Sequence, residues 1–121
     1  NEILKEIMIP VPKEGSVQKF FKRGSRKALT LSRISMGFYA EIEDGAVAEF
    51  RAGAGSMSPI PIRLPKLEAS VRGKTLTIET AAETARQEVN PRKSSAWRKA
   101  MTANAVRDFL NEIADKSQYL R

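Results

Sequence analysis

The stretch LSRISMGFYAEIEDGAVAEFRAGA, residues 31–54, determines the fold more than any other part of the chain. Between positions 34 and 42 the even residues are apolar and the odd residues are more polar, which is the two-residue period of a half-buried strand. Asp44-Gly45, a strong signal for a tight turn, follows, and the even positions 46–54 are again apolar. The stretch therefore predicts a β-hairpin.

Two shorter elements are predicted before the hairpin. Residues 2–9 alternate in side-chain type until Pro10 ends the run, which predicts a first strand. Val17, Phe20 and Phe21 follow at the i, i+3, i+4 spacing of one helical face, and a glycine closes the run. This spacing predicts a short helix between the first strand and the hairpin.

Three helices are predicted after a bent loop rich in glycine and proline. Pro65 suits the first position of a helix that ends at Gly73, and Thr77 can cap a second helix that Asn90-Pro91 stops. Ser94 or Ser95 begins the last and longest helix, in which Trp97 is expected to belong to the core. The expected fold is α+β, a three-stranded antiparallel sheet packed against a helical layer in the order β-α-β-β-α-α-α.

Composition limits the chemistry that this chain can perform. Its 121 residues are expected to form one domain, residues 1–121, and no apolar run approaches the ~20 residues that span a bilayer, so we expect a cytoplasmic protein. The absence of cysteine and histidine excludes disulfides, thiolate zinc sites, iron–sulfur ligation and nucleophiles activated by histidine. We therefore expect no catalytic residue, no metal ligand and an inactive isolated domain.

Positive charge is concentrated before the hairpin. The chain carries a formal charge of +7, and residues 13–33 hold seven basic side chains against one acid. The run 22–27 could bind a phosphate or the edge of a flavin, although such a run is often only a solvated surface. A basic nucleic-acid-binding module is the alternative function, and docking on an acidic partner protein is a third, weaker possibility.

Four stretches, spread over nearly the whole chain, stand out as motifs. They are EILKEIMIP at 2–10, FFKRGSRKALTLS at 20–32, GSMSPIPIR at 55–63 and SSAWRK at 94–99. In this order they resemble the C-terminal domain of the FAD-binding subunit of molybdenum hydroxylases, the family that includes xanthine dehydrogenase and aerobic carbon monoxide dehydrogenase. The second stretch resembles the basic segment that approaches the flavin in this family.

The resemblance implies a subunit that carries electrons from iron–sulfur clusters through FAD to an acceptor such as NAD. It implies that the substrate is oxidised at a molybdenum centre on another subunit. The FAD-binding domains that precede this one in the family are absent from this chain, so the chain alone is not expected to hold FAD tightly. The implied partners are those preceding domains and the molybdopterin-binding and iron–sulfur subunits, and neither a membrane nor a nucleic acid is expected.

The resemblance also implies which residues approach the cofactor. Lys22, Ser25 and Arg26 match the lysine, serine and arginine of the segment near the flavin, where a cation could stabilise a reduced flavin or a phosphate. Thr30 stands where many relatives have an aspartate, which puts the acidic contact to the flavin or nicotinamide in doubt. Arg63 matches the loop arginine, for which a structural role is expected. The expected cofactor-binding residues are Lys22, Ser25, Arg26, Thr30 and Ser32.

Overall fold

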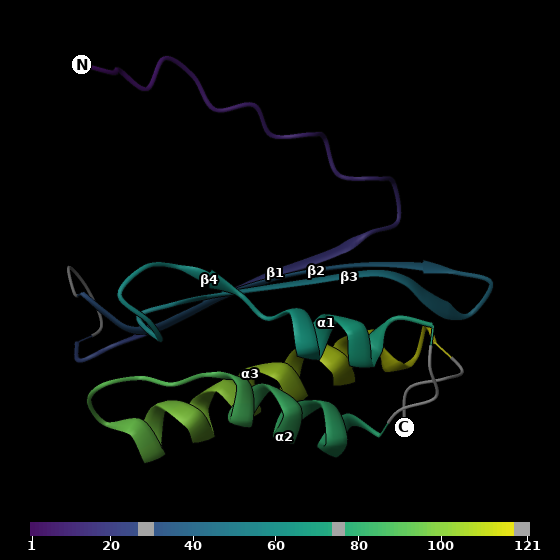
Figure 1. Cartoon of the computed structure of the whole chain (residues 1–121). Helices are drawn as coiled ribbons and strands as arrows, with labels where there is room; N and C mark the ends of the chain where they lie inside the picture. Colours follow the sequence, from purple (N-terminus) through teal and green to yellow (C-terminus); the bar gives the residue numbers. More distant parts are fainter. Residues whose placement is uncertain (27–30, 74–76, 118–121) are drawn as a thin grey trace.

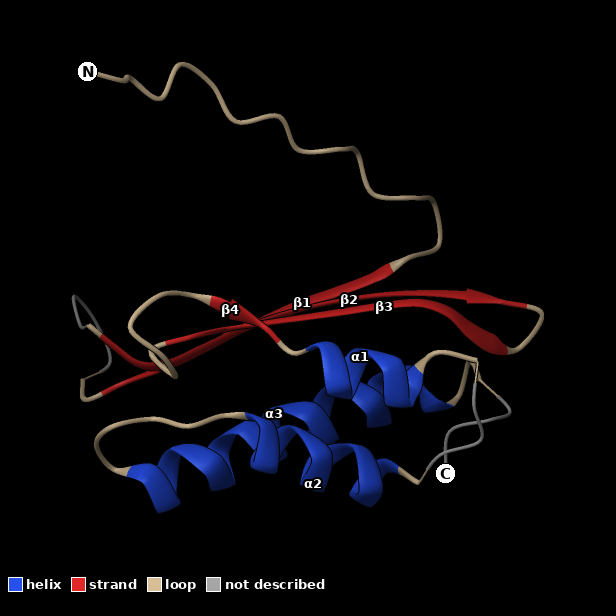
Figure 2. Ribbon diagram, viewed as in Figure 1, coloured by secondary structure: helices blue, strands red, loops and turns tan. Residues whose placement is uncertain are grey.

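Four antiparallel strands form one layer, and three helices pack against one face of this sheet (Figures 1 and 2). The computed structural model describes residues 1–26, 31–73 and 77–117. The strands lie in the order β1-β2-β3-β4. The elements are β1 (Val17–Gly24), β2 (Ser32–Glu43), β3 (Ala46–Gly55), β4 (Ile62–Arg63), α1 (Pro65–Val71), α2 (Ile78–Glu88) and α3 (Ser95–Ala114). The α+β class is confirmed, with four strands in place of the three expected.

The predicted hairpin is present as β2 and β3, and its turn lies at Asp44 and Gly45, which both have positive φ. The even residues of β2 from Ile34 to Ala40 are buried against the helices, as the alternation predicts. A bulge lies near the turn, because the partner of Glu41 is Glu49 whereas the partner of Ile42 is residue 47. The extra residue in β3 shifts the alternation there, so Val47 is buried in place of its even-numbered neighbours.

The expected helix near residue 20 is wrong, because Val17–Gly24 is strand β1. It pairs with β2 along its whole length, from Val17 opposite Ala40 to Gly24 opposite Ser32. Phe20 and Phe21 point to opposite faces, and Phe20 is 71% exposed. The apolar spacing of residues 17–21 fits a helix as well as a strand. The edge of β2 offers a row of backbone hydrogen-bond partners, and pairing with this edge favours the strand.

The expected strand at residues 2–9 is also wrong. This segment has no regular structure and runs extended away from the rest of the molecule (Figure 1). Its apolar side chains are exposed, with Ile3 at 92% and Ile9 at 82%. Alternating residues form a strand only where another strand pairs with them, and none of the described strands does so here.

The three helices begin where the sequence predicts, with Pro65 in the first turn of α1 and the Thr77 side chain accepting a hydrogen bond from Thr80 N at 3.1 Å. Helix α3 covers the centre of the sheet, where Phe109 stacks on Phe38 with ring centroids 5.0 Å apart. Phe50 also packs against the ring of Phe109, so residues from β2, β3 and α3 form one core. No helix in the described ranges is long and apolar enough to cross a membrane.

A buried carboxylate joins the short strand β4 and helix α1 to β3. Glu68, whose side chain is 5% exposed, accepts hydrogen bonds from Arg63 Nε at 2.7 Å and from Ala52 N at 3.0 Å. Burial alone would raise the pKa of Glu68, but these hydrogen bonds and the charges of Arg63 and Arg72 outweigh it and hold the pKa below its usual value. The contact of Arg63 with Glu68 gives this loop arginine a structural role.

Candidate functional site

Four of the five expected cofactor-binding residues lie at one end of the sheet. Lys22 is exposed near the end of β1, and Ser25 and Arg26 follow directly after the strand. Gly24 pairs with Ser32, the first residue of β2, so the two ends of the basic segment are neighbours. Thr30 lies outside the described residues. The structure therefore brings Lys22, Ser25, Arg26 and Ser32 to a common region, which we call the basic end of the sheet.

The loop after β3 is joined to this end by hydrogen bonds. Ser56 Oγ donates to the backbone oxygen of Ser32 at 3.0 Å, and Arg98 Nη1 donates to the backbone oxygen of Ser56. Ser56 has a φ of 64°, a left-handed conformation that a non-glycine residue adopts only at a cost. Because Ser32, Ser56 and Arg98 come from three different motifs, these contacts bring together segments that are far apart in the sequence.

Residues at the start of α3 also contact Arg33 in β2. The guanidinium carbon of Arg33 lies 5.0 Å from the centroid of the Trp97 ring, and Arg33 Nη2 lies 3.4 Å from Ser94 Oγ. Trp97 is 39% exposed, so the expectation that it belongs to the core is wrong. A cation above an aromatic face is attracted to the ring, which explains why the indole lies at the surface beside an arginine.

The basic end carries cations that have no carboxylate partner in the described part of the chain. These residues are Lys22, Arg23, Arg26, Arg33, Arg92, Lys93 and Arg98. The arginines paired with glutamates, which lie elsewhere, are Arg51, Arg63, Arg72, Arg86 and Arg107. Positive charge that is not neutralised within the chain attracts anionic ligands.

The basic end can bind and stabilise negative charge. Its side chains are hydrogen-bond donors and cations, which suit a phosphate, a carboxylate or an anionic ring system. No group of three or more histidine, cysteine, aspartate or glutamate residues capable of holding a metal ion occurs among residues 1–26, 31–73 and 77–117. The donor set fits the reduced, negatively charged form of a flavin, or its phosphates.

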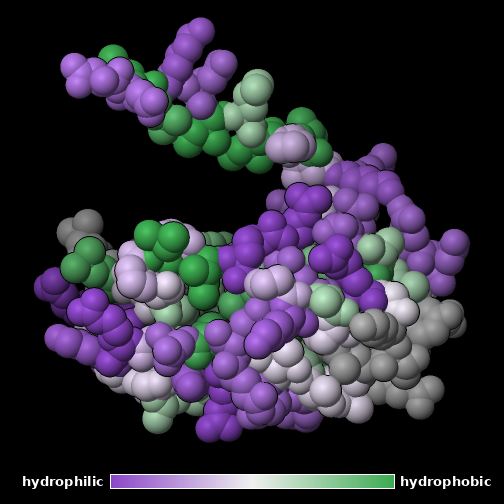
Figure 3. All heavy atoms as spheres, viewed as in Figure 1, coloured by the Kyte–Doolittle hydropathy of each residue, from purple (hydrophilic) through white to green (hydrophobic). Residues whose placement is uncertain are grey.

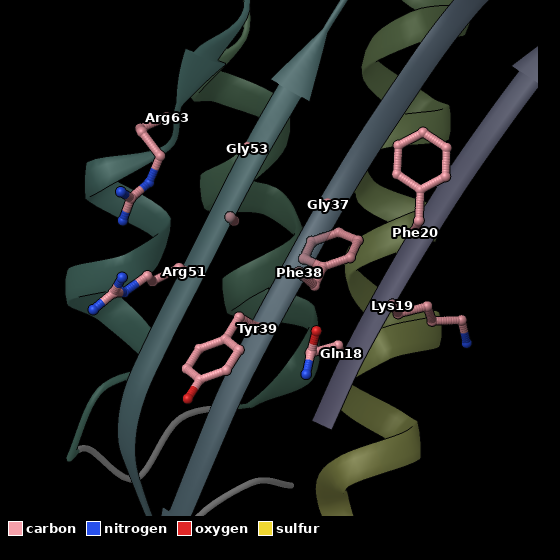
Figure 4. Close-up of a pocket in the computed structure, with 10 residues that line it drawn as sticks. Gln18, Lys19, Phe20, Gly37, Phe38, Tyr39, Arg51, Gly53 and Arg63 are labelled. Atoms are coloured by element: carbon pink, nitrogen blue, oxygen red, sulfur yellow. The ribbon is translucent and has the colours of Figure 1, made fainter. Parts of the chain in front are cut away.

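Two features of this structure were not predicted from the sequence. Arg92 and Lys93, in the segment before α3, also lie at the basic end. The sequence feature that could have indicated this is their position directly before the fourth motif. The other feature is a shallow hollow of about 450 Å³ on the face of the sheet opposite the helices (Figure 4). Phe20, Gly37, Gly53 and Arg63 form one row across the four strands there. This row could not be predicted from the sequence, because the residues around Phe20 were expected to form a helix.

A family profile matches most of the chain. Residues 19–113, from β1 almost to the end of α3, match the profile of the CO dehydrogenase flavoprotein C-terminal domain. A curated relative, the nicotinate dehydrogenase FAD-subunit of Eubacterium barkeri, is 29% identical over 85 residues. That alignment covers 69% of this chain and 29% of the relative.

Solved structures share the fold. Carbon monoxide dehydrogenase from Hydrogenophaga pseudoflava matches with a TM-score of 0.79 and 19% identity, over 90% of this chain and 40% of that chain. Quinoline 2-oxidoreductase from Pseudomonas putida 86 matches with a TM-score of 0.73 and 19% identity, over 92% of this chain and 40% of that chain. The chain thus spans less than half the length of the proteins it matches.

Proposed function

Because the chain belongs to the CO dehydrogenase flavoprotein C-terminal domain family, we propose that its basic end forms one edge of a flavin site in a molybdenum hydroxylase. The observation that carries this proposal is the cluster of cations at the end of β1 and the start of β2, which form no ion pair with the carboxylates that the structure describes. FAD, when bound, supplies the electron-transfer chemistry, which this chain's own side chains cannot perform.

The residues of this chain have a supporting electrostatic role. Lys22 and Arg26 provide positive charge close to the β1 end, which stabilises negative charge on a neighbouring ring system or phosphate. Ser25 and Ser32 add hydroxyl groups that can donate hydrogen bonds. The contact of Ser56 with Ser32 fixes the start of β2, so the donors are held in place before a ligand arrives.

Most of the FAD would be held by domains that precede this one in the same subunit. The exposed apolar residues of the N-terminal segment fit such an arrangement, because side chains such as Ile3 and Met8 would be buried by a neighbouring domain. Figure 3 shows hydrophobic side chains along the extended segment and others on the body of the molecule below it. The other partners in this proposal are the molybdopterin-binding and iron–sulfur subunits.

Electrons would pass from iron–sulfur clusters to the FAD and then to an acceptor such as NAD, in the cytoplasm. The substrate would be oxidised at the molybdenum centre of another subunit. The name of the curated relative, a FAD-subunit of a dehydrogenase, supports a flavin role. The family match gives no support to the alternative of a nucleic-acid-binding module.

Flavin retention tests this proposal. The chain is expressed together with the coding region that precedes it, and flavin is measured by absorbance after gel filtration. We expect flavin to copurify with the longer protein, whereas the isolated chain should be colourless after FAD is added and the excess removed. A longer protein that retains no flavin, or an upstream region without an FAD-binding domain, would contradict the proposal.

A further inference from the structure

A cavity of about 380 Å³ opens beside the basic end, between the start of β2, the loop after β3 and the segment before α3. Three cationic side chains and three serines line much of it, and none of its lining residues is acidic. They are Arg92, Lys93, Arg98, Ser32, Ser56 and Ser58. A concave site with converging donors and no acceptor charge is suited to an anion.

The walls of this cavity are fixed by contacts within the chain. Arg98 donates to the backbone oxygen of Ser56, and Thr102 Oγ1 donates to the sulfur of Met57 at 3.9 Å, which holds the start of α3 against the loop. Met57, adjacent to Ser56, is completely buried and anchors the loop in the core. Little ordering of this loop and of the start of α3 is therefore needed when a ligand binds, which lowers the cost of binding.

The charges of the cavity are not compensated. Arg92, Lys93 and Arg98 form no ion pair within the described ranges. Arg98 Nε is also buried with no hydrogen-bond partner there. Holding three like charges around one cavity costs free energy unless an anion neutralises them, and a buried donor without a partner adds to that cost.

From these features we propose that the cavity binds a phosphoryl group. A phosphoryl group offers three strong acceptor oxygens and up to two negative charges, and so matches the donors from two arginines, one lysine and the serine hydroxyls better than a carboxylate, which has two oxygens and one charge. The group can come from inorganic phosphate or from the diphosphate of a nucleotide. The inference does not depend on the flavin proposal, because every lining residue belongs to this chain.

Trp97 makes the proposal testable with the isolated chain, because it is the only tryptophan and lies next to Arg98. Its fluorescence is followed during titration with inorganic phosphate, pyrophosphate or ADP at constant ionic strength, with potassium chloride as the blank. We expect a saturable change that chloride does not produce. Equal affinity for all three would indicate a site for a free phosphate, and tighter binding of pyrophosphate and ADP would indicate a nucleotide diphosphate.

The variant R92Q/K93Q should weaken binding about tenfold or more, because it removes two charge-assisted contacts. The matched control is K5Q/K66Q, which removes the same charge from exposed lysines outside the cavity and should change the affinity less than about twofold. Calorimetry measures the heat of binding and so detects a ligand that leaves the Trp97 emission unchanged. Absence of binding by both methods, or equal loss in the two variants, would overturn the proposal.

Discussion

Glu68 shows how one buried side chain can make the stability of this fold depend on pH. Its pKa is held below the usual value of 4.5 in the folded chain, chiefly because the hydrogen bonds from Arg63 and Ala52 overcome the effect of burial. A carboxylate with a lowered folded pKa stabilises the protein above its unfolded pKa, and this contribution is lost as the pH falls through the folded pKa.

The substitution E68Q should therefore lower the free energy of unfolding at pH 7 by about 1–3 kcal/mol, because Arg63 loses its charged partner. The difference from the unsubstituted chain should begin to shrink below about pH 4.5, where the carboxylate of the unfolded chain becomes protonated, and should continue to shrink as the pH falls through the lower pKa of the folded chain. Urea unfolding followed by Trp97 fluorescence at pH 7, 5 and 3 measures both effects.

The control for this prediction is E112Q, which changes an exposed glutamate paired with Lys19 at the surface. An exposed ion pair contributes about 0–1 kcal/mol, so this variant should lose less stability at pH 7 than E68Q. Equal losses in the two variants, or a difference from wild type that stays constant down to pH 3, would show that the buried carboxylate lacks the role assigned to it.

Among the elements, the turn of the β2–β3 hairpin depends on a backbone conformation that glycine adopts without strain. Gly45 has a φ of 75°, so G45A should lower the free energy of unfolding by about 1–2 kcal/mol. The comparison variant is G37A, because a Cβ at that strand position meets nothing within 4 Å. G37A should leave the stability unchanged or raise it by up to about 1 kcal/mol. Thermal unfolding of the two variants, measured in parallel, tests this prediction. Equal changes in stability in G45A and G37A would contradict it.

The hairpin was predictable because its evidence is local: a two-residue alternation on both sides of Asp44-Gly45. Strand β1 was not predictable in this way, since Val17, Phe20 and Phe21 satisfy a helical spacing and only the edge of β2 decides the outcome. Residues 2–9 show the converse. Their residue types alternate as in a strand, but the segment has no regular structure because no described strand pairs with it. Helices with clear caps, such as the one that begins after Thr77, were located correctly.

The candidate site was predictable only in part. Family resemblance identified the segments around Lys22, Ser56 and Arg98 one at a time, but their convergence depends on tertiary hydrogen bonds that no local pattern reveals. Arg92 and Lys93 were missed because basic residues on a surface are common, and only the cavity distinguishes these two.

For the molecule as a whole, two kinds of surface are available to partners. The basic end carries cations that have no carboxylate partner among the described residues, and exposed apolar side chains lie along the N-terminal segment and on the outer face of the sheet at Phe20 (Figures 3 and 4). In the proposed subunit, the apolar surfaces would contact other domains and the basic end would face the flavin. Catalysis would then depend on the cofactor, and this domain would adjust the electrostatic environment of that cofactor.

The reduction potential of the flavin in the longer subunit tests this account most directly. The variant K22Q/R26Q should keep its flavin but have a lower midpoint potential than wild type, because two cations that stabilise the negatively charged reduced flavin are lost. The control K66Q/K116Q, with the same change in charge at exposed lysines elsewhere, should keep the wild-type potential. A full complement of flavin with the same potential in K22Q/R26Q as in the control would contradict the claim that the basic end borders the flavin.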